Sequence, residues 1–485
     1  MFEAIKKKRE AIYFTLILLF QTGLVCSKFL MSSSLILWAL FFLLFGDYSL
    51  FRKRISENPW WWALFTFWVL HLVSMLWSTD MDSAWDGVRV RISLWAIPIL
   101  VLGSCSLTPK LTFRLIRYLL LAIAIVIILN IVHYLYLINT NRALDIRQLS
   151  GFGSHIRFGI LCAFSVFLAF ELWRRNQLSN LLTWGFSLLA ISYTLFAQTF
   201  SALLSLMVVL ISIALLLLRR HKKLRYIFLS ATAFFGALMV WGSFDLFTPE
   251  APCGQFKNLT QCKLEWEKKS SFDFEGSDRK NQSLIRTAER FICSQSLPLN
   301  SETIRLLSSE DIQAIENGHA HISSVKGGLL GRYYELKFQI HDATDPNGHS
   351  LLQRVEFWKA SWHIVKRNVG FGVGIGDIDK EMAWSYQQIH SPLLKENQRR
   401  SHNMYLTTWI GVGIIGLVLF TMIIGWVLKI AIQEKRNALL IFIIIATLTM
   451  TFEDSLETQA GASFFGFFIA ILASKQSRAT WRIKN

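Results

Sequence analysis

Long, continuous apolar runs recur along this chain, and they constrain its fold more than any other feature. A helix needs about 20 apolar residues to cross the hydrocarbon core of a bilayer. Candidate spans lie near residues 11–28, 30–46, 60–77, 92–106, 118–138, 156–173, 182–198, 200–218, 226–246, 404–430, 438–452 and 460–474. The runs do not alternate with polar residues, which indicates helices and not barrel strands. We therefore predict an all-α polytopic membrane protein with about twelve transmembrane helices.

The distribution of charge indicates how these helices are oriented. The chain has a formal net charge of +17, but the long segment 247–401 has 20 Lys and Arg residues against 19 Asp and Glu. The excess positive charge lies in short connectors, such as KKKR at 6–9 and RRHKKLR at 219–225. By the positive-inside rule we expect these connectors and both termini in the cytoplasm and 247–401 outside. This pattern argues against binding of nucleic acid.

The long polar segment divides the chain into three regions. We predict an N-terminal membrane region at 1–246 with about nine spans, an external loop domain at 247–403, and a C-terminal membrane region at 404–485 with about three. A loop of this length is expected to fold. Within it, GRYYELKFQIHD at 331–342 has a strand-like composition, and LLQRVEFWKASWHIVKR at 351–367 has helical periodicity. We expect helices and short strands there.

Glycine and cysteine residues in the loop suggest structural roles. Gly372, Gly374 and Gly376 follow an apolar helix and no clear strand, so helix termination and a tight return to the membrane explain them better than a dinucleotide site. A disulfide bond can persist in an external loop. Cys253 to Cys262 is the shortest closure and leaves Cys293 over, although the sequence does not fix the pairing.

No cofactor site is apparent in the sequence. The histidines of the loop lack metal-ligand spacing, so we expect no metal and no cofactor. No G-x-x-x-x-G-K-[ST] stretch is present, so we do not expect nucleotide hydrolysis to power the protein.

Polar residues are concentrated at the predicted outer ends of two spans. QRRSHNMYL at 398–406 places Arg399, Arg400, His402 and Asn403 at the mouth of the tenth span, and SHIRFG at 154–159 places His155 and Arg157 at the sixth. A lone histidine at an interface is more often an anchoring residue than a catalyst. Polar groups near hydrocarbon are nevertheless costly and frequently functional.

An arginine also lies on the apolar face of the helix predicted at 351–367. Arg354 shares that face with Trp358, although the helix itself is also typical of an amphipathic segment lying on a membrane. Guanidinium groups bind phosphates through two-point contacts. A neutral imidazole near pH 7 can accept a proton from an attacking hydroxyl. Arg354, Arg157, Arg400 and His402 would therefore suit the phosphate headgroup of a lipid-linked substrate.

Two segments of the chain resemble a known family. SHNMYLTTWIGVGIIGLVLF is similar to the His-Asn-x-Tyr-Leu…Gly-x-x-Gly signature of the O-antigen ligase and polymerase superfamily. RVEFWKASWHIVKRNVGFGVGIGD is similar to the segment that precedes this signature. The resemblance extends over most of the chain: many spans, one dominant external loop before the signature, and a few spans after it.

The resemblance implies a metal-independent glycosyltransferase of the bacterial inner membrane, acting on its periplasmic side. Direct attack of the acceptor on the donor would be a single displacement, so we expect inversion at the anomeric carbon. Its substrates would be a glycan linked to undecaprenyl diphosphate and a lipid A–core acceptor, in contact with membrane lipids. His402 would match the base and Arg354 a diphosphate-binding arginine, joined by Arg400. Asn403, Trp358 and His155 would support them. Where many members carry Ser-Arg, this chain reads AQTFSALL, with Phe200 in the arginine's place; Arg157 is the candidate substitute.

Two other functions compete with a ligase. An O-antigen polymerase would use the same chemistry on a growing glycan, and its motifs overlap with those of the ligase. We favour the ligase because the order and spacing of the two motifs are closer to that branch. A twelve-span transporter of lipid-linked glycans would be expected to have pseudo-repeated halves. The single large loop breaks that symmetry.

Overall fold

The computed structural model describes residues 2–104, 108–140, 146–152, 154–218, 254–279, 282–325, 328–341, 346–347 and 349–481. The chain divides into two units, each described here by itself. The membrane unit comprises Met1–Leu217, Ile364–Glu381 and Ser401–Asn485, and the loop unit comprises Leu218–His363 and Met382–Arg400.

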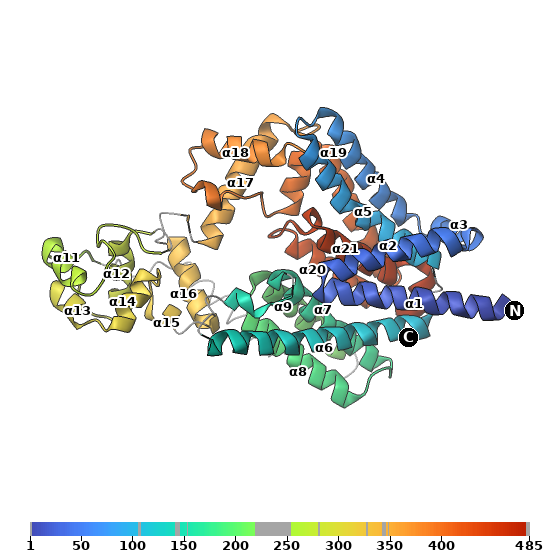
Figure 1. Ribbon diagram of the computed structural model, residues 1–485, viewed down its shortest axis with the longest axis horizontal. Coiled ribbons are helices and arrows are strands. Elements are labelled where there is room, and N and C mark those ends of the chain that lie inside the picture. Colours follow the sequence, from blue (N-terminus) through green and yellow to red (C-terminus); the bar gives the residue numbers. More distant parts are fainter. Residues whose placement is uncertain are drawn as a thin grey trace. The chain divides into compact units, whose positions relative to one another are not determined.

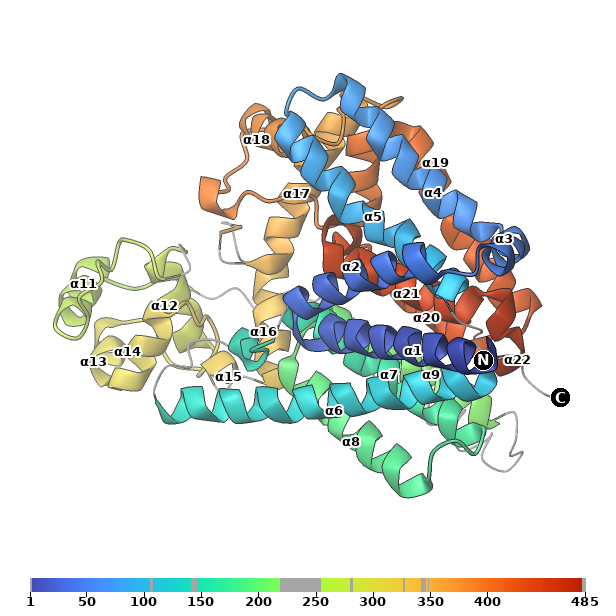
Figure 2. The same ribbon diagram turned by 45° about the vertical axis from the view of Figure 1, so that its right-hand side comes forward.

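The membrane unit is a bundle of helices (Figures 1 and 2). Its helices are α1 (Phe2–Cys26), α2 (Lys28–Phe45), α3 (Tyr48–Glu57), α4 (Trp60–Val73), α5 (Met81–Ser104), α6 (Pro109–Asn139), α7 (His155–Arg174), α8 (Asn180–Ala197), α9 (Phe200–Leu218), α19 (Met404–Gln433), α20 (Asn437–Thr449), α21 (Gln459–Ala473) and α22 (Arg478–Trp481). Figure 2 places the start of α1 and the short α22 at the same end of this unit.

The described helices confirm an all-α polytopic membrane protein. Nine of them are long and apolar enough to cross a membrane, and α20 and α21 are shorter apolar helices. The span predicted at 226–246 lies outside the described residues.

One predicted span begins much earlier than the sequence suggested. α5 starts at Met81 and not near residue 92, so most of the acidic stretch 78–86 is helical. Asp80 explains this start, because its carboxylate accepts hydrogen bonds from the Ser83 backbone N–H and hydroxyl, each at 2.9 Å. These bonds, the backbone one first, lower the pKa of Asp80 below its ordinary value. A carboxylate in this position caps a helix N-terminus.

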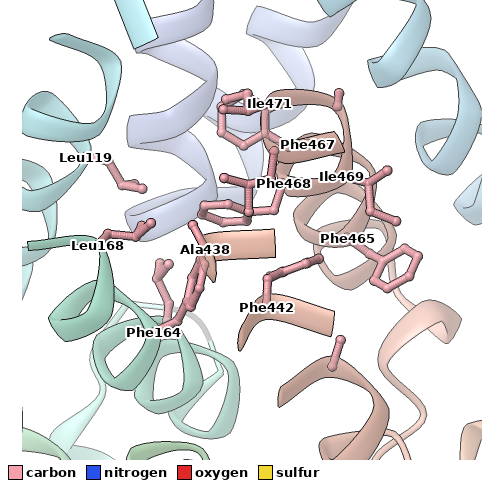
Figure 3. Close-up of a cluster of buried hydrophobic side chains, with 14 of the residues drawn as sticks. Leu119, Phe164, Leu168, Ala438, Phe442, Phe465, Phe467, Phe468, Ile469 and Ile471 are labelled. Carbon is pink, nitrogen blue, oxygen red and sulfur yellow. The ribbon is translucent and has the colours of Figure 1, made fainter. Parts of the chain in front are cut away.

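Aromatic side chains of three helices form the centre of the membrane unit (Figure 3). Phe164 of α7, Phe442 of α20 and Phe468 of α21 contact one another, with ring centroids 5.3–5.5 Å apart. Membrane helices associate through such close packing and through small residues at their interfaces. Gly466 of α21 is one of these, because a Cβ there would lie 3.0 Å from the Leu94 carbonyl oxygen of α5.

α19 is kinked, and the segment that contains Gly372, Gly374 and Gly376 (the glycine string) forms hydrogen bonds with its backbone at the kink. Gly413 lies inside α19 with a φ of +70°, which interrupts the helical hydrogen bonding. Backbone groups released at membrane depth need other partners. The Val373 N–H donates to the Ile410 carbonyl at 2.8 Å and the Gly374 N–H to the Gly411 carbonyl at 3.0 Å. In return, the Ile414 N–H donates to the Val369 carbonyl at 2.9 Å.

The glycine string itself has a structural role, in agreement with the sequence interpretation. α17 (Ser350–Arg367) ends just before it. Gly372 and Gly374 have φ values of +71° and +92°, a region that favours glycine. A Cβ at Gly376 would lie 2.1 Å from the Asp80 carbonyl oxygen, so the string also passes closely against the start of α5.

The loop unit is also helical over the residues that the structure describes. Its helices are α11 (Leu259–Glu267), α12 (Leu284–Cys293), α13 (Ser301–Leu306), α14 (Ser309–Glu316), α15 (Ile322–Val325) and α16 (Gly328–His341), while α17 and α18 (Ile378–Gln388) contribute residues to both units. Buried side chains that include Trp266, Phe274 and Phe291 form its core.

The expected strand at 331–342 is wrong, because α16 covers all but its last residue. Aromatic and β-branched residues favour strands only weakly, and a strand also requires a partner. Within the described part of the loop unit, a single isolated bridge between Ser277 and Ser283 is the only β pairing.

The shortest disulfide closure in the loop does not form. Cys262 is a free thiol, fully buried within α11, whereas Cys293 is disulfide-bonded. Burial raises the pKa of the Cys262 thiol. Because Cys26 and Cys162 are also free, the partner of Cys293 lies outside the described residues. Proximity in sequence therefore did not decide the pairing.

The topology gives a first testable prediction. Ser309 at the start of α14 and Lys53 in α3 are both exposed, and they belong to connectors predicted on opposite sides of the membrane. We expect a membrane-impermeant maleimide to label Ser309→Cys in intact spheroplasts and Lys53→Cys only after permeabilisation. The unsubstituted chain measures background labelling of the native cysteines. Labelling of Lys53→Cys alone in intact cells would reverse the orientation.

The packing at the α19 kink gives a second prediction. A Cβ at Gly372 would lie 2.4 Å from the Ile410 carbonyl oxygen, in a backbone conformation that alanine strains. We expect Gly372→Ala to lower the free energy of unfolding by more than about 2 kcal/mol. Gly425→Ala is the matched control, because nothing lies within 4 Å of its Cβ position. Apparent melting temperatures in detergent measure both, and equal values would contradict the proposed packing role.

Candidate functional site

His402 lies in the turn that starts α19. Asn403 caps this helix, with its side-chain oxygen accepting from the Tyr405 N–H at 3.0 Å and the Leu406 N–H at 3.1 Å. His402, immediately before the cap, has a φ of +46°. Such a left-handed conformation costs a non-glycine residue about 1–3 kcal/mol and persists only where its surroundings enforce it.

Asp454 provides that enforcement. One of its carboxylate oxygens accepts from the His402 backbone N–H at 2.9 Å, and the other accepts from the Thr407 hydroxyl at 2.8 Å. Hydrogen bonds to an ionised acceptor contribute about 1.5–3 kcal/mol each. The carboxylate therefore fixes the backbone of His402 to the first turn of α19.

The neighbouring carboxylate, Glu453, faces the imidazole itself. Its Oε2 lies 4.0 Å from His402 Nδ1, which is too long for a hydrogen bond but close enough for a strong electrostatic interaction. The Glu453 side chain is 15% exposed and that of His402 is 39% exposed, so the pair is only partly screened by solvent.

Arg157 belongs to the same cluster. It lies in the first turn of α7, and its Nη1 donates to the Thr458 hydroxyl at 2.8 Å. Thr458 in turn caps α21 by accepting from the Gly461 N–H at 3.2 Å. Glu453 also interacts electrostatically with Arg157. His402 and Arg157, far apart in sequence, therefore meet around the loop between α20 and α21, and His155 begins the same helix as Arg157.

The loop between α20 and α21 is tied to α5 at its other end. Glu457, in the short helix η4 (Ser455–Glu457), forms an ion pair with Arg91. The side chains of Arg91 and Glu457 are 1% and 9% exposed. Arg91 also donates to the Gly87 carbonyl at 2.8 Å.

The sequence alone does not single out Arg91, Glu453, Asp454 or Glu457. The stretch EDSLETQ at 453–459 reads only as an acidic segment after an apolar span. Three carboxylates in this position were the available signal, since the arginine and histidine predicted at the outer ends of other spans could pair with them. Across the described residues, no group of three or more His, Cys, Asp or Glu side chains is arranged to hold a metal ion.

The remaining candidates belong to the loop unit. Arg354 and Trp358 are half-buried on α17, and Arg354 Nη1 donates to the Ser350 carbonyl at 3.3 Å. Further along α17, Ser361 is buried, but Trp362 is 46% exposed. The most buried side of α17 instead runs through Phe357, Ala360 and Ile364. Arg354 and Trp358 therefore lie at the edge of this buried side.

Arg400 is half-buried in the stretch that leads out of the loop unit. Tyr386 anchors this stretch, because its hydroxyl donates to the Arg399 carbonyl at 2.6 Å. Burial raises the pKa of Tyr386, so the hydroxyl keeps its proton at neutral pH. Arg354, Trp358 and Arg400 thus lie in the loop unit, whereas His402, Asn403, His155 and Arg157 lie in the membrane unit.

Phe200 occupies the first position of α9 and is 60% exposed. Its ring meets that of Phe452 edge-on, with centroids 5.1 Å apart. Phe452 directly precedes Glu453, so an aromatic contact borders the site at this position.

The anchoring role of Asp454 gives a third prediction. Asp454→Ala removes the acceptor from both the His402 N–H and the Thr407 hydroxyl, so the strained turn should open. We expect limited trypsinolysis after Arg399 and Arg400 to proceed at least about tenfold faster, since 1.4 kcal/mol corresponds to a factor of ten. Asp273→Ala, at a carboxylate that is 64% exposed, is the control. Unchanged cleavage would show that Asp454 does not hold the turn.

Comparison with known protein families finds one whose sequence model matches part of the chain. A sequence model of the O-antigen ligase family matches residues 185–421, a range that includes Arg354 and His402 but not Arg157 or Asp454. No curated protein matches the chain. Residues 185–421 therefore match an O-antigen ligase domain, and this match and the membrane-spanning helices are consistent with the O-antigen ligase and polymerase superfamily of the bacterial inner membrane.

Proposed function

We propose that this protein transfers a glycan from undecaprenyl diphosphate to a sugar hydroxyl of lipid A–core, on the periplasmic face of the inner membrane. One observation carries the proposal: His402, within the O-antigen ligase domain, is held in a strained turn at the start of α19 by Asp454. Strained residues that their surroundings over-determine are characteristic of functional sites.

Three observations support the periplasmic orientation. The basic connectors alternate with acidic or mixed ones, as the positive-inside rule requires. Cys293 is disulfide-bonded, and such bonds persist in oxidising compartments. In Figure 2 the start of α1 and α22 also lie at the same end of the membrane unit, as the even number of crossings expected from the sequence requires. We place both termini in the cytoplasm and the site outside.

His402 is the proposed base. Because its Nδ1 faces Glu453, its Nε2 is the atom that would accept the proton of the acceptor hydroxyl. A sugar hydroxyl is a weak nucleophile, and a positioned base contributes about 10²–10⁴-fold to the rate. The Glu453 carboxylate would stabilise the imidazolium that forms, and Asn403 would fix the turn through its cap.

The reaction would be a single displacement with inversion. The acceptor oxygen forms a bond to the anomeric carbon while the bond from that carbon to the diphosphate oxygen breaks. The proton passes to His402, and the bonding electron pair leaves with undecaprenyl diphosphate. Fixed cations would lower the barrier by stabilising the negative charge that develops on the leaving group. No step requires a metal.

Arginines are the proposed ligands of the diphosphate. In the membrane unit, Arg157 would take the role of the arginine that Phe200 replaces. In the loop unit, described by itself, Arg354 and Arg400 are candidates for binding a phosphate group, with Trp358 one turn further along α17 as a supporting residue. Guanidinium groups suit this role because they contact phosphate oxygens in pairs. His155 would support the site from the start of α7.

A polymerase is the alternative within the same superfamily. It would use the same site and donor with a growing glycan as acceptor. The order and spacing of the two motifs favour the ligase. A transporter of lipid-linked glycans is the weaker alternative, because the single large loop interrupts any symmetry between halves of the chain.

The proposed base gives a fourth prediction. His402→Gln keeps the size and polarity of the side chain without its basicity, so we expect transfer to fall by about 10²-fold or more. His402→Ala should lose at least as much, with both proteins made at normal levels. The measurement is the amount of long-chain lipopolysaccharide formed in a deletion strain. Transfer at the wild-type rate by His402→Gln would mean that His402 only anchors the helix.

The same deletion strain separates ligase from polymerase. Loss of all long-chain bands, with lipid-linked polymer accumulating, is the result expected for a ligase. Attachment of a single repeat to the core would instead identify a polymerase.

A further inference from the structure

The first turns of α6 present three cations on one face. Lys110, Arg114 and Arg117 are exposed, and their spacings of four and three residues place them on the same side of the helix, over about 10 Å along its axis. None of the three forms an ion pair of 4.0 Å or less with a carboxylate of the described residues. This cationic cluster (Lys110, Arg114 and Arg117) takes no part in the functions described above.

α6 is long enough to keep the cationic cluster outside the hydrocarbon. Its 31 residues correspond to about 46 Å of helix, whereas the hydrocarbon core of a bilayer is about 30 Å thick. The part of α6 that follows Arg117 is still about 33 Å long and can cross the core by itself. The cluster then lies at the depth of the lipid headgroups, where tyrosines such as the 40% exposed Tyr118 are also common.

Beyond the cationic cluster, the same face of α6 is apolar and exposed. Leu121, Ile125 and Ile128 are 54%, 48% and 53% exposed. They follow Arg117 by four, eight and eleven residues, so they continue the side of the helix that carries the cations. A single lipid can therefore meet the cations with its headgroup and these aliphatic side chains with its acyl chain.

α1 holds one cation of the cluster in place. α1 runs beside α6 (Figures 1 and 2), and the guanidinium carbon of Arg114 lies 4.6 Å from the ring centroid of Phe14 and 5.9 Å from that of Tyr118. The two rings themselves meet edge-on, with centroids 6.0 Å apart. A guanidinium stacked on aromatic rings loses little further freedom when its N–H groups bind a phosphate in a two-point contact.

We propose that this face of α6 binds an anionic phospholipid, with its phosphate at the cationic cluster and an acyl chain along Leu121 and Ile128. Three cations within about 10 Å repel one another, and a phosphate relieves that repulsion. A zwitterionic headgroup brings a cation of its own and relieves it less. The inference is independent of the proposed glycan transfer, because none of the residues assigned to that reaction belongs to α6.

A lipid-binding measurement tests the proposal. A fluorescent phosphatidylglycerol would be bound to the full-length protein in a neutral detergent and displaced by unlabelled lipids. We expect phosphatidylglycerol to compete at least about tenfold better than phosphatidylcholine with the same acyl chains. This preference should shrink as salt is added, because surface charges are screened. Soluble glycerol phosphate, which lacks the chains, should compete weakly.

Substitution by glutamine assigns the binding to the cationic cluster. Glutamine has nearly the helix propensity of lysine and arginine, so Lys110→Gln, Arg114→Gln and Arg117→Gln should leave α6 intact. Each should weaken phosphatidylglycerol binding by about fivefold, and the triple variant by about 10²-fold. The matched control removes the same net charge from exposed cations elsewhere in the membrane unit, through Arg52→Gln, Lys53→Gln and Lys435→Gln combined.

The results that would overturn the inference are distinct. Equal competition by phosphatidylcholine, or unchanged binding in the three single variants, would show that the cationic cluster does not select an anionic lipid. A loss in the control as large as that in the triple variant would assign the effect to net charge. Competition by glycerol phosphate as strong as that by the lipid would identify a site for soluble phosphates.

Discussion

The buried ion pair between Arg91 and Glu457 is the constraint on which the arrangement of the site depends. An ionised side chain removed from water is costly, and leaving one partner of a buried pair alone costs about 3–5 kcal/mol. Arg91 belongs to α5 and Glu457 to the loop between α20 and α21, so the pair fixes this loop to a spanning helix. Glu453 and Asp454 precede Glu457 in the same loop, and their positions relative to α19 follow from that attachment.

A second constraint fixes the other side of the site. The kink at Gly413 releases backbone carbonyls of α19, and the glycine string after α17 supplies their donors. Beyond the kink, α19 continues as an ordinary membrane helix. Before it, the segment from Met404 to Val412 forms a separately held turn and short helix, capped by Asn403. The strain at His402 is sustained because this segment is tied at the kink and at Asp454.

Much of the fold could be predicted because it follows from local composition. Apolar runs identified the spans within the described residues, and polar residues at their ends identified His402, Asn403 and Arg157 as a group. The start of α5 was misplaced because a capping carboxylate, Asp80, extends the helix beyond its apolar part. The strand expected at 331–342 failed because composition alone does not supply a pairing partner.

The anchors of the site could not be predicted because they are contacts across long sequence separations. Nothing near Asp454 in the sequence indicates that its carboxylate receives the His402 N–H, 52 residues away. Glu457, the partner of Arg91, is still more distant in sequence, 366 residues away. Charge complementarity between the acidic segment 453–459 and the cations of other helices was the only clue, and it does not specify which residues pair.

The charges of the cluster explain why a histidine suits this position. Glu453 interacts with a permanent cation, Arg157, and faces the proposed base, His402. A diphosphate bound at Arg157 would supply the negative charge that Glu453 otherwise provides there. In the proposed transfer, the Glu453 carboxylate would then face an imidazole that becomes positive as it takes the acceptor proton. Because these groups are partly shielded from water, the attraction is stronger than it would be in solution. The same carboxylate can therefore balance charge both before and during the transfer.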